Sequence, residues 1–139
     1  MEKVTRANAI TSVVPLLMVA DMERALAFYV GGLGFKVQGR WIPHGHLRWC
    51  RIARDDVCLM LQEAEGPARE RLNFQRAIGS GPSLYFACRD ALAVYREASK
   101  RGMPARREPV TGEFVWEVFL VDPDGCKITF STLINLPFA

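Results

Sequence analysis

Histidine is scarce in this chain of 139 residues, which contains only His44 and His46. A metal site built on these two would have to take its remaining donors from carboxylates. The four cysteines form no C-x-x-C pair, and each lies within an apolar, strand-like run. We therefore expect reduced core thiols, as in a cytoplasmic protein, rather than a disulfide framework.

Long apolar runs and long basic runs are also missing. No run approaches the roughly 18 residues that a membrane helix needs. The first residues lack a signal-peptide layout, because their apolar stretch continues directly into a helical pattern. The net charge is only +3, which is too small and too scattered to indicate a nucleic-acid partner. The sequence predicts a cytoplasmic domain with neither a membrane nor a nucleic-acid partner.

The first half of the chain alternates between strand and helix patterns. A strand over 13–19 precedes a helix that Asp21 caps and that ends at Gly31-Gly32. A short strand at 35–37 follows, and then a hairpin of 46–53 and 57–62 around Arg54-Asp55. Residues 63–82 are rich in glycine, proline and charge, which predicts a connector with one short helix at 68–77.

The same order then repeats. A strand at 83–88 precedes a helix over 91–98 that Asp90 caps, followed by a short strand at 104–107. A hairpin of 114–121 and 126–131 closes around the turn 122–125, Asp-Pro-Asp-Gly. Val19-x-Asp21 and Cys88-x-Asp90 lie 69 residues apart. The repeat is one of pattern, with little identity between the halves.

These motifs carry a family resemblance. The stretch VPLLMVADMERALAFYVGGLGFKV, together with LYFACRDALAVYREASKRG and FLVDPDGCKITF, resembles the glyoxalase / bleomycin-resistance / extradiol dioxygenase superfamily, also called the vicinal oxygen chelate fold. The resemblance implies an α+β fold of two βαβββ modules, whose mixed sheets curl around a cleft. We expect a single domain over 1–139, with module 1 at about 12–62, a linker at 63–82 and module 2 at about 83–132.

Metal-dependent members of that family place four ligands in the cleft. Carried over to this chain, the four positions are Val14, Cys58, Ser83 and Thr129. Valine cannot bind a metal, serine and threonine are poor neutral ligands, and one thiolate cannot hold an ion alone. The resemblance therefore implies a member without the family's metal centre and without a cofactor. His44-Gly45-His46 leaves three interpretations open: a solvent-facing turn, a metal site or a ligand contact.

Strand alternation predicts what lines the cleft instead. Cys50, Ile52, Val57, Leu59 and Leu61 form the more apolar set and are expected to face the helix. The opposite face, together with the family's ligand positions, gives the predicted ligand-binding residues: Met18, Trp49, Arg51, Cys58, Met60, Ser83, Tyr85, Trp116 and Thr129. An aromatic lining with a few polar tips suits flat or amphipathic organic ligands. The alternative is that these rings are core.

The last hairpin raises a separate question of side-chain direction. If it closes on a four-residue turn, Thr129 shares its face with Trp116, Val118, Leu120 and Ser131. Glu117 then falls among core-facing residues. It either lies at the exposed end of its strand, which we favour, or enters the cleft through a bulge. In the cleft, Glu117 would be the candidate general base.

Three functions are compatible with these patterns. The first is a metal-free small-molecule binder of the bleomycin-resistance type, working as a homodimer. The net basic charge and Arg51 argue against cationic bleomycin itself as the ligand. The second is a lyase, isomerase or dioxygenase of the same superfamily, and whether the chain is an enzyme stays open. The third is a cleft face that serves as a protein interface.

Overall fold

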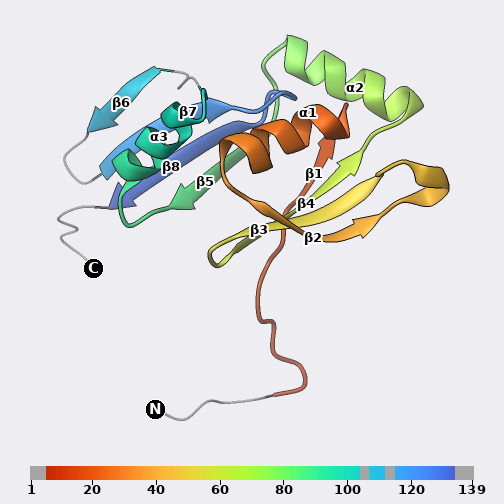
Figure 1. The fold of residues 1–139 in the computed structure, drawn as a ribbon, viewed down its shortest axis with the longest axis horizontal. Helices are drawn as coiled ribbons and strands as arrows, with labels where there is room; N and C mark the ends of the chain where they lie inside the picture. The colour runs from red at the N-terminus through yellow and green to blue at the C-terminus, as the bar shows by residue number, and fades with distance from the viewer. Residues whose placement is uncertain (1–5, 104–106, 112–114, 134–139) are drawn as a thin grey trace.

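Two four-stranded sheets form the body of the protein (Figure 1). The computed structural model describes residues 6–103, 107–111 and 115–133, and of these it describes only the backbone for 107–111, 115, 116 and 133. The first sheet has the order β1-β4-β3-β2 and the second the order β5-β8-β7-β6. In each, one parallel pair (β1 with β4, β5 with β8) joins two antiparallel pairs. The protein is thus a mixed α+β fold.

Each sheet comes from one half of the chain, in the order strand, helix, three strands. The first half contains β1 (Leu16–Val19), α1 (Met22–Leu26) with a π-helical continuation (Ala27–Gly32), β2 (Lys36–Trp41), a 3-10 turn (Pro43–Gly45), β3 (Trp49–Arg54) and β4 (Val57–Glu63). The linker carries α2 (Gly66–Ala77). The second half contains β5 (Ser83–Ala87), α3 (Ala91–Lys100), β6 (Arg107–Thr111), β7 (Val115–Val121) and β8 (Lys127–Leu133). Two βαβββ modules are therefore confirmed.

Both expected helix caps are present. The side chain of Asp21 accepts a hydrogen bond from the Arg24 amide at 3.2 Å, and that of Asp90 accepts one from the Ala93 amide at 3.1 Å. Each carboxylate thus satisfies an amide that has no partner within its own helix. The short strand expected at 104–107 is displaced, because β6 covers Arg107–Thr111 and residues 104–106 lie outside the described residues.

One hydrophobic core joins the two modules. It packs the inner face of the first sheet, including Ile52 and Leu59, against α1, and it continues through Val118 and Ile128 of the second sheet to Ala91 of α3. The predicted helix-facing residues Cys50, Ile52, Leu59 and Leu61 are buried in this core, and the fifth, Val57, is partly buried and packs against it. Figure 1 shows α1 and α3 on one side of the sheets. No helix among the described residues is long and apolar enough to cross a membrane.

A polar contact also ties the modules together. The buried Asp122 accepts a hydrogen bond from the Tyr29 hydroxyl at 2.6 Å, and Asp124 Oδ1 accepts one from the Ala20 amide at 3.0 Å. Asp122 and Asp124 belong to the β7–β8 turn, whereas Ala20 and Tyr29 flank the start and end of the α1 region. The turn is therefore anchored on the first module by two buried carboxylates.

Candidate functional site

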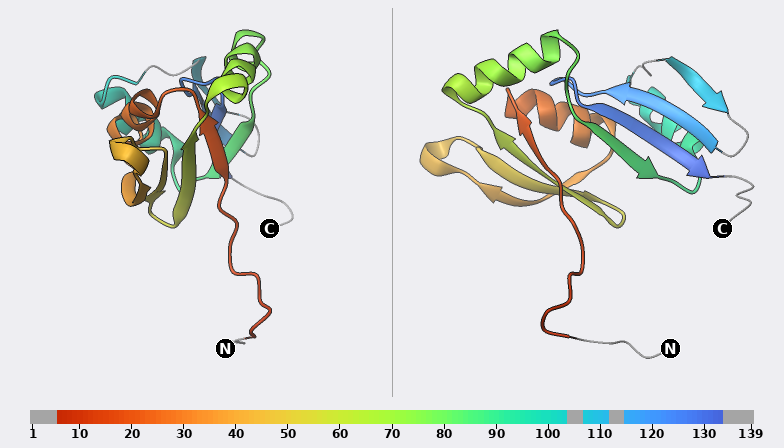
Figure 2. Two further views of the ribbon diagram at one scale, coloured as in Figure 1. Left: turned by 90° about the vertical axis from the view of Figure 1, so that its right-hand side faces the viewer. Right: turned by 180° about the vertical axis from the view of Figure 1, so that it is seen from behind.

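The faces of the two sheets that α1 and α3 do not cover carry the candidate site. Viewed from behind, as in the right panel of Figure 2, β1, β4, β5 and β8 lie in front of α1 and α3. We call the uncovered sides the open faces. Side chains alternate across a strand, so the ladder register decides which residues lie on each open face.

The open face of the first sheet is apolar and aromatic. Met18 is 39% exposed, and its neighbour on the same strand, Leu16, pairs with Met60. Met60 pairs in turn with Arg51, and Trp49 pairs with Trp41, whose ring is 57% exposed. The predicted residues Met18, Trp49, Arg51, Cys58 and Met60 therefore share one face. Trp41 was not among them, although alternation back from Trp49 across the β2–β3 connection could have found it.

The open face of the second sheet is more polar. Tyr85 is 68% exposed and pairs with Thr129, which is buried. These two and Ser83 line a hollow of about 140 Å³ together with Phe119 and Lys127. The structure thus brings together three of the predicted residues. Phe119 was missed because the direction of the β7 side chains was predicted incorrectly, whereas Lys127 could have been found by alternation from Thr129 on β8.

The β7 prediction fails at the turn. Asp122 Oδ1 accepts hydrogen bonds from the amides of Asp124 at 2.9 Å and Cys126 at 2.8 Å. The Asp122 amide also donates to the Cys126 carbonyl at 2.9 Å. Cys126 therefore belongs to the connection, and the ladder begins with Val121 opposite Lys127. A connection one residue longer than expected reverses the face of every β7 side chain relative to β8.

The corrected register changes which β7 residues accompany Thr129. Phe119 pairs with Thr129 and Glu117 with Ser131, so Glu117 lies on the open face without any bulge. Val118 and Leu120, expected beside Thr129, are buried in the core instead. Trp116 pairs with Thr132, so strand alternation does not place it on the same face as Thr129. The side chain of Trp116 lies outside what the structure describes.

The family's metal positions do not form a donor set here. Val14 precedes β1 and offers no donor, Ser83 is exposed, and Thr129 is a neutral hydroxyl. The register also indicates that Met60, rather than Cys58, corresponds to Thr129, because Leu16 pairs with Met60 as Tyr85 pairs with Thr129. A thioether at this position does not suit a hard or borderline divalent ion. Within the described ranges no cluster of three His, Cys, Asp or Glu side chains could hold a metal.

The two histidines lie on the 3-10 turn and directly after it. His46 Nε2 is 2.6 Å from Glu63 Oε1, and Glu63 Oε2 accepts a hydrogen bond from the Met22 amide at 2.8 Å. Arg48 also contacts Glu63, at 3.1 Å. Burial acts to raise the pKa of Glu63, but the hydrogen bonds from His46 and Met22 and the charge of Arg48 outweigh it, so the net pKa is lowered. This arrangement places His46 against the start of α1.

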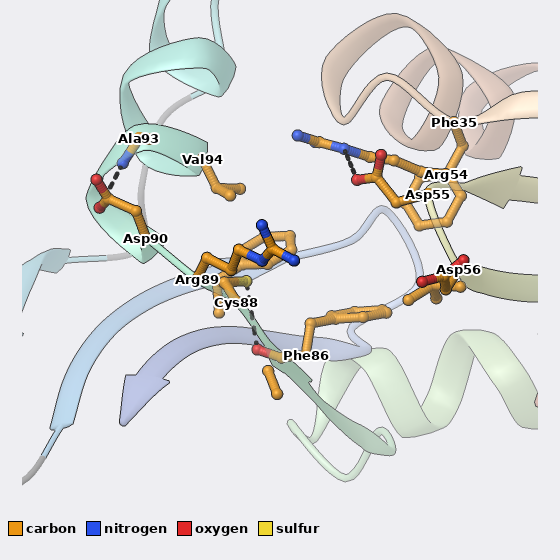
Figure 3. Close-up of a pocket in the computed structure, with 13 residues that line it drawn as sticks. Phe35, Arg54, Asp55, Asp56, Phe86, Cys88, Arg89, Asp90, Ala93 and Val94 are labelled. Carbon is orange, nitrogen blue, oxygen red and sulfur yellow. Dashed lines mark hydrogen bonds and ion pairs between the residues drawn. The ribbon is translucent and has the colours of Figure 1, made fainter. Parts of the chain in front are cut away.

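A larger hollow lies away from both open faces. It measures about 630 Å³ and lies between the β3–β4 turn of the first module and the start of α3 in the second (Figure 3). Phe35, Phe86 and Phe130 contribute its apolar walls. The sequence patterns did not indicate this cavity, because its two sides meet only through the packing of the modules.

Comparison with known proteins agrees with this architecture. Residues 9–130 match the family model described as Glyoxalase/Bleomycin resistance protein/Dioxygenase superfamily. An uncharacterized protein of Bacillus subtilis (strain 168), YurT, is 31% identical over 114 residues, which cover 77% of this chain and 87% of YurT.

Two solved structures are similar in fold. A bleomycin resistance determinant encoded on the transposon Tn5 has a TM-score of 0.69 at 22% identity, covering 91% of this chain and 100% of its own. TnmS3, an antibiotic binding protein from Streptomyces sp. CB03234, has a TM-score of 0.63 at 24% identity, covering 91% and 99%. The family match and the shared pair of βαβββ modules lead to one conclusion: this chain belongs to the Glyoxalase/Bleomycin resistance protein/Dioxygenase superfamily.

Proposed function

We propose that the protein is a metal-free small-molecule-binding protein that holds a flat, amphipathic organic ligand against its open faces. One observation carries the proposal: Trp41 and Tyr85, which the strand registers place on the open faces, are large aromatic residues that are 57% and 68% exposed. Exposed aromatic surface of this kind is costly in water and is common where a ligand or partner binds. The antibiotic-binding and bleomycin-resistance structures of the same fold support a small-molecule ligand.

The two open faces would contact different parts of such a ligand. Trp41, Trp49 and Met60 offer stacking and apolar contact, with Arg51 as the nearby cation. Ser83 and Thr129 offer hydroxyl groups, and Lys127 adds a second cation at the hollow. A molecule with an aromatic body and a polar or anionic edge would use both faces.

The proposal includes a homodimer. Leu16, Met18 and Tyr85 are exposed on the open faces, so a single chain does not enclose a ligand there. β1 and β5 each end a sheet and so have unpaired edges among the described strands. A two-fold partner would cover both faces and edges at once and would convert them into clefts.

Fluorescence titration tests the binding proposal. Neutral 2-naphthol should change the tryptophan emission with micromolar affinity, since stacking and burial contribute on the order of 1–3 kcal/mol per ring contact. Trp49→Ala should weaken this binding about tenfold or more and should leave the melting temperature nearly unchanged. The control is Phe28→Leu, a change in the core beneath α1, which should lower stability without removing binding. If Trp49→Ala collapses the fold and no aromatic compound perturbs the emission, the ring is core and the proposal fails.

A second candidate is metal-independent acid–base catalysis, favoured by the corrected position of Glu117. This half-buried carboxylate lies on the open face one ladder step from Phe119 and Thr129. A lyase or isomerase of this family would use Glu117 as the general base. Glu117→Gln would then abolish turnover while retaining ligand binding. A variant that binds and turns over a substrate as well as the native protein would exclude this role.

A further inference from the structure

The cavity of about 630 Å³ lies where the β3–β4 turn of the first module meets the start of α3 in the second. Several residues with the same role in the two modules lie 69 positions apart, as Asp21 and Asp90 do. Glu63 accepts from the Met22 amide at 2.8 Å, and the residue 69 positions later, Thr132, accepts from the Ala91 amide at 2.6 Å. The strand registers match in the same way. Positions in β1 and β4 therefore have counterparts 69 residues later, whereas positions in β3 have counterparts 68 residues later in β7.

One side of the repeat is closed by protein groups. Asp124 reaches the Ala20 amide, and Tyr29 reaches Asp122, so the β7–β8 turn is anchored beside the start of α1. On the other side, the counterpart of Tyr29 is Ala98. Ala53 pairs with Cys58 as Val121 pairs with Lys127, so Arg54 takes the position of Asp122 in this shorter turn. The side chain of Asp55 in this turn is 87% exposed and lies beside Arg54. The cavity opens on this side, between the β3–β4 turn and the start of α3.

The walls of this space are mainly aromatic. The rings of Phe35 and Phe86 have centroids 6.4 Å apart, and those of Phe86 and Phe130 are stacked at 5.3 Å. Val57 and Val94 complete the apolar lining. The volume falls within the range of roughly 300–1,000 Å³ that is typical of small-molecule sites. A flat apolar body of one or two rings fits such a lining.

The charged groups at the mouth fix the sign of the ligand. Arg54 is already occupied, because it donates to the Leu33 carbonyl at 2.7 Å and to Glu97 at 3.1 Å. Asp90 is occupied by its cap contact with Ala93. Among the residues that the structure describes, Arg89 has no acidic partner, and Figure 3 shows its side chain extending over the cavity between α3 and Phe86. The nearby exposed Asp56 disfavours a second negative charge on the ligand.

We propose that this cavity is a second binding site, separate from the open faces, for a small monoanionic aromatic carboxylate. The ring lies against Phe35, Phe86 and Phe130, and the carboxylate pairs with the Arg89 guanidinium. An arginine–carboxylate contact of this kind is among the stronger polar interactions in proteins.

Calorimetric and NMR titration with 2-naphthoate tests the site in the full-length protein. Binding should shift the backbone amide signals of Arg89, Asp56 and Ala93. Arg89→Ala should weaken the affinity about tenfold or more, which is the loss expected for a charge-assisted contact with a carboxylate. Arg96→Ala, which removes an exposed arginine from the same helix outside the cavity, should leave the affinity unchanged. Ala93→Trp should block binding by filling the space.

The remaining variants separate this site from the proposed ligand site on the open faces. Arg51→Ala should not affect naphthoate binding here, and uncharged 2-naphthamide should bind equally to native and Arg89→Ala protein. The proposal is wrong if Arg51→Ala removes naphthoate binding while Arg89→Ala retains it. It is also wrong if native protein binds no naphthoate at millimolar concentration. Neither result would affect the separate test with 2-naphthol and Trp49→Ala.

Discussion

The hydroxyl of Tyr29 and the carboxylate of Asp122 lie 2.6 Å apart and join residues 93 positions apart in the chain. Burial raises the pKa of the Tyr29 hydroxyl far above its usual range, and the Asp122 charge adds to this shift, so the phenol stays a neutral donor. The same Asp122 side chain organises the β7–β8 turn. One buried contact therefore connects the π-helical end of the α1 region to the turn that sets the register of the second sheet.

Replacing Tyr29 with phenylalanine removes this contact with little change in volume. We expect Tyr29→Phe to lower the free energy of unfolding by about 1–3 kcal/mol, because it leaves a buried carboxylate with one donor fewer. Urea denaturation at neutral pH measures the change. Tyr85→Phe, which removes an exposed hydroxyl, should change stability by much less. Equal stability of the two variants would mean that the Tyr29 contact contributes nothing net.

The second carboxylate of the turn predicts a pH effect. Burial raises the pKa of Asp124, although the Ala20 amide opposes this, and the neighbouring Asp122 charge adds to the rise. A raised pKa in the folded state gives stability that is fully present below the unfolded pKa of about 3.9 and is lost as pH rises through the folded pKa. Asp124→Asn cannot titrate and keeps an acceptor for Ala20. Its stability relative to the native protein should therefore improve between pH 3.5 and pH 6.

Urea denaturation at several pH values across this window checks the Asp124 effect. Asp56→Asn, which removes an exposed carboxylate from the β3–β4 turn, is the matched control. Curves for Asp124→Asn and native protein that stay parallel over the whole window would contradict the prediction.

The purified protein should carry no stoichiometric divalent metal, since Val14, Ser83 and Thr129 provide no charged or imidazole donor. Elemental analysis for zinc, nickel, iron and manganese checks this. About one metal ion per chain, retained in a His44→Ala/His46→Ala variant, would overturn the prediction. Loss of the metal in that double variant would instead assign a site to the histidine turn.

Sedimentation should show a homodimer at micromolar concentration. Leu16→Glu places a charge on the open face of an edge strand and should shift the equilibrium toward the monomer. Arg96→Glu, on the exposed side of α3, should leave the dimer intact. A native protein that sediments at the mass of one chain would argue against a shared cleft.

Local signals predicted most of the fold. Short stretches of sequence are enough to recognise the two caps, Asp21 and Asp90. They are also enough to recognise the alternation of Cys50, Ile52, Leu59 and Leu61. The first open face follows from the same alternation. These features need only neighbours a few residues apart, which is why pattern and propensity suffice for them.

The features that were missed depend on contacts between distant residues. The length of the β7–β8 connection is set by the Asp122 side chain, which no strand pattern reports, and so Glu117 and Phe119 were assigned to the wrong face. The intermodule cavity depends on how the β3–β4 turn of one module packs against the start of α3 in the other. A cavity of this kind becomes visible only when the two modules are seen packed together.

The turn that Asp122 organises also limits which changes of chain length this protein can accept during evolution. Loss of one residue from it would carry Glu117 toward the core and bring Val118 and Leu120 out toward water. Removal of two residues would keep the alternation of β7 intact. Inherited insertions and deletions at this turn should therefore change its length by two residues rather than by one. Only an even change keeps the β7 side chains on their present faces.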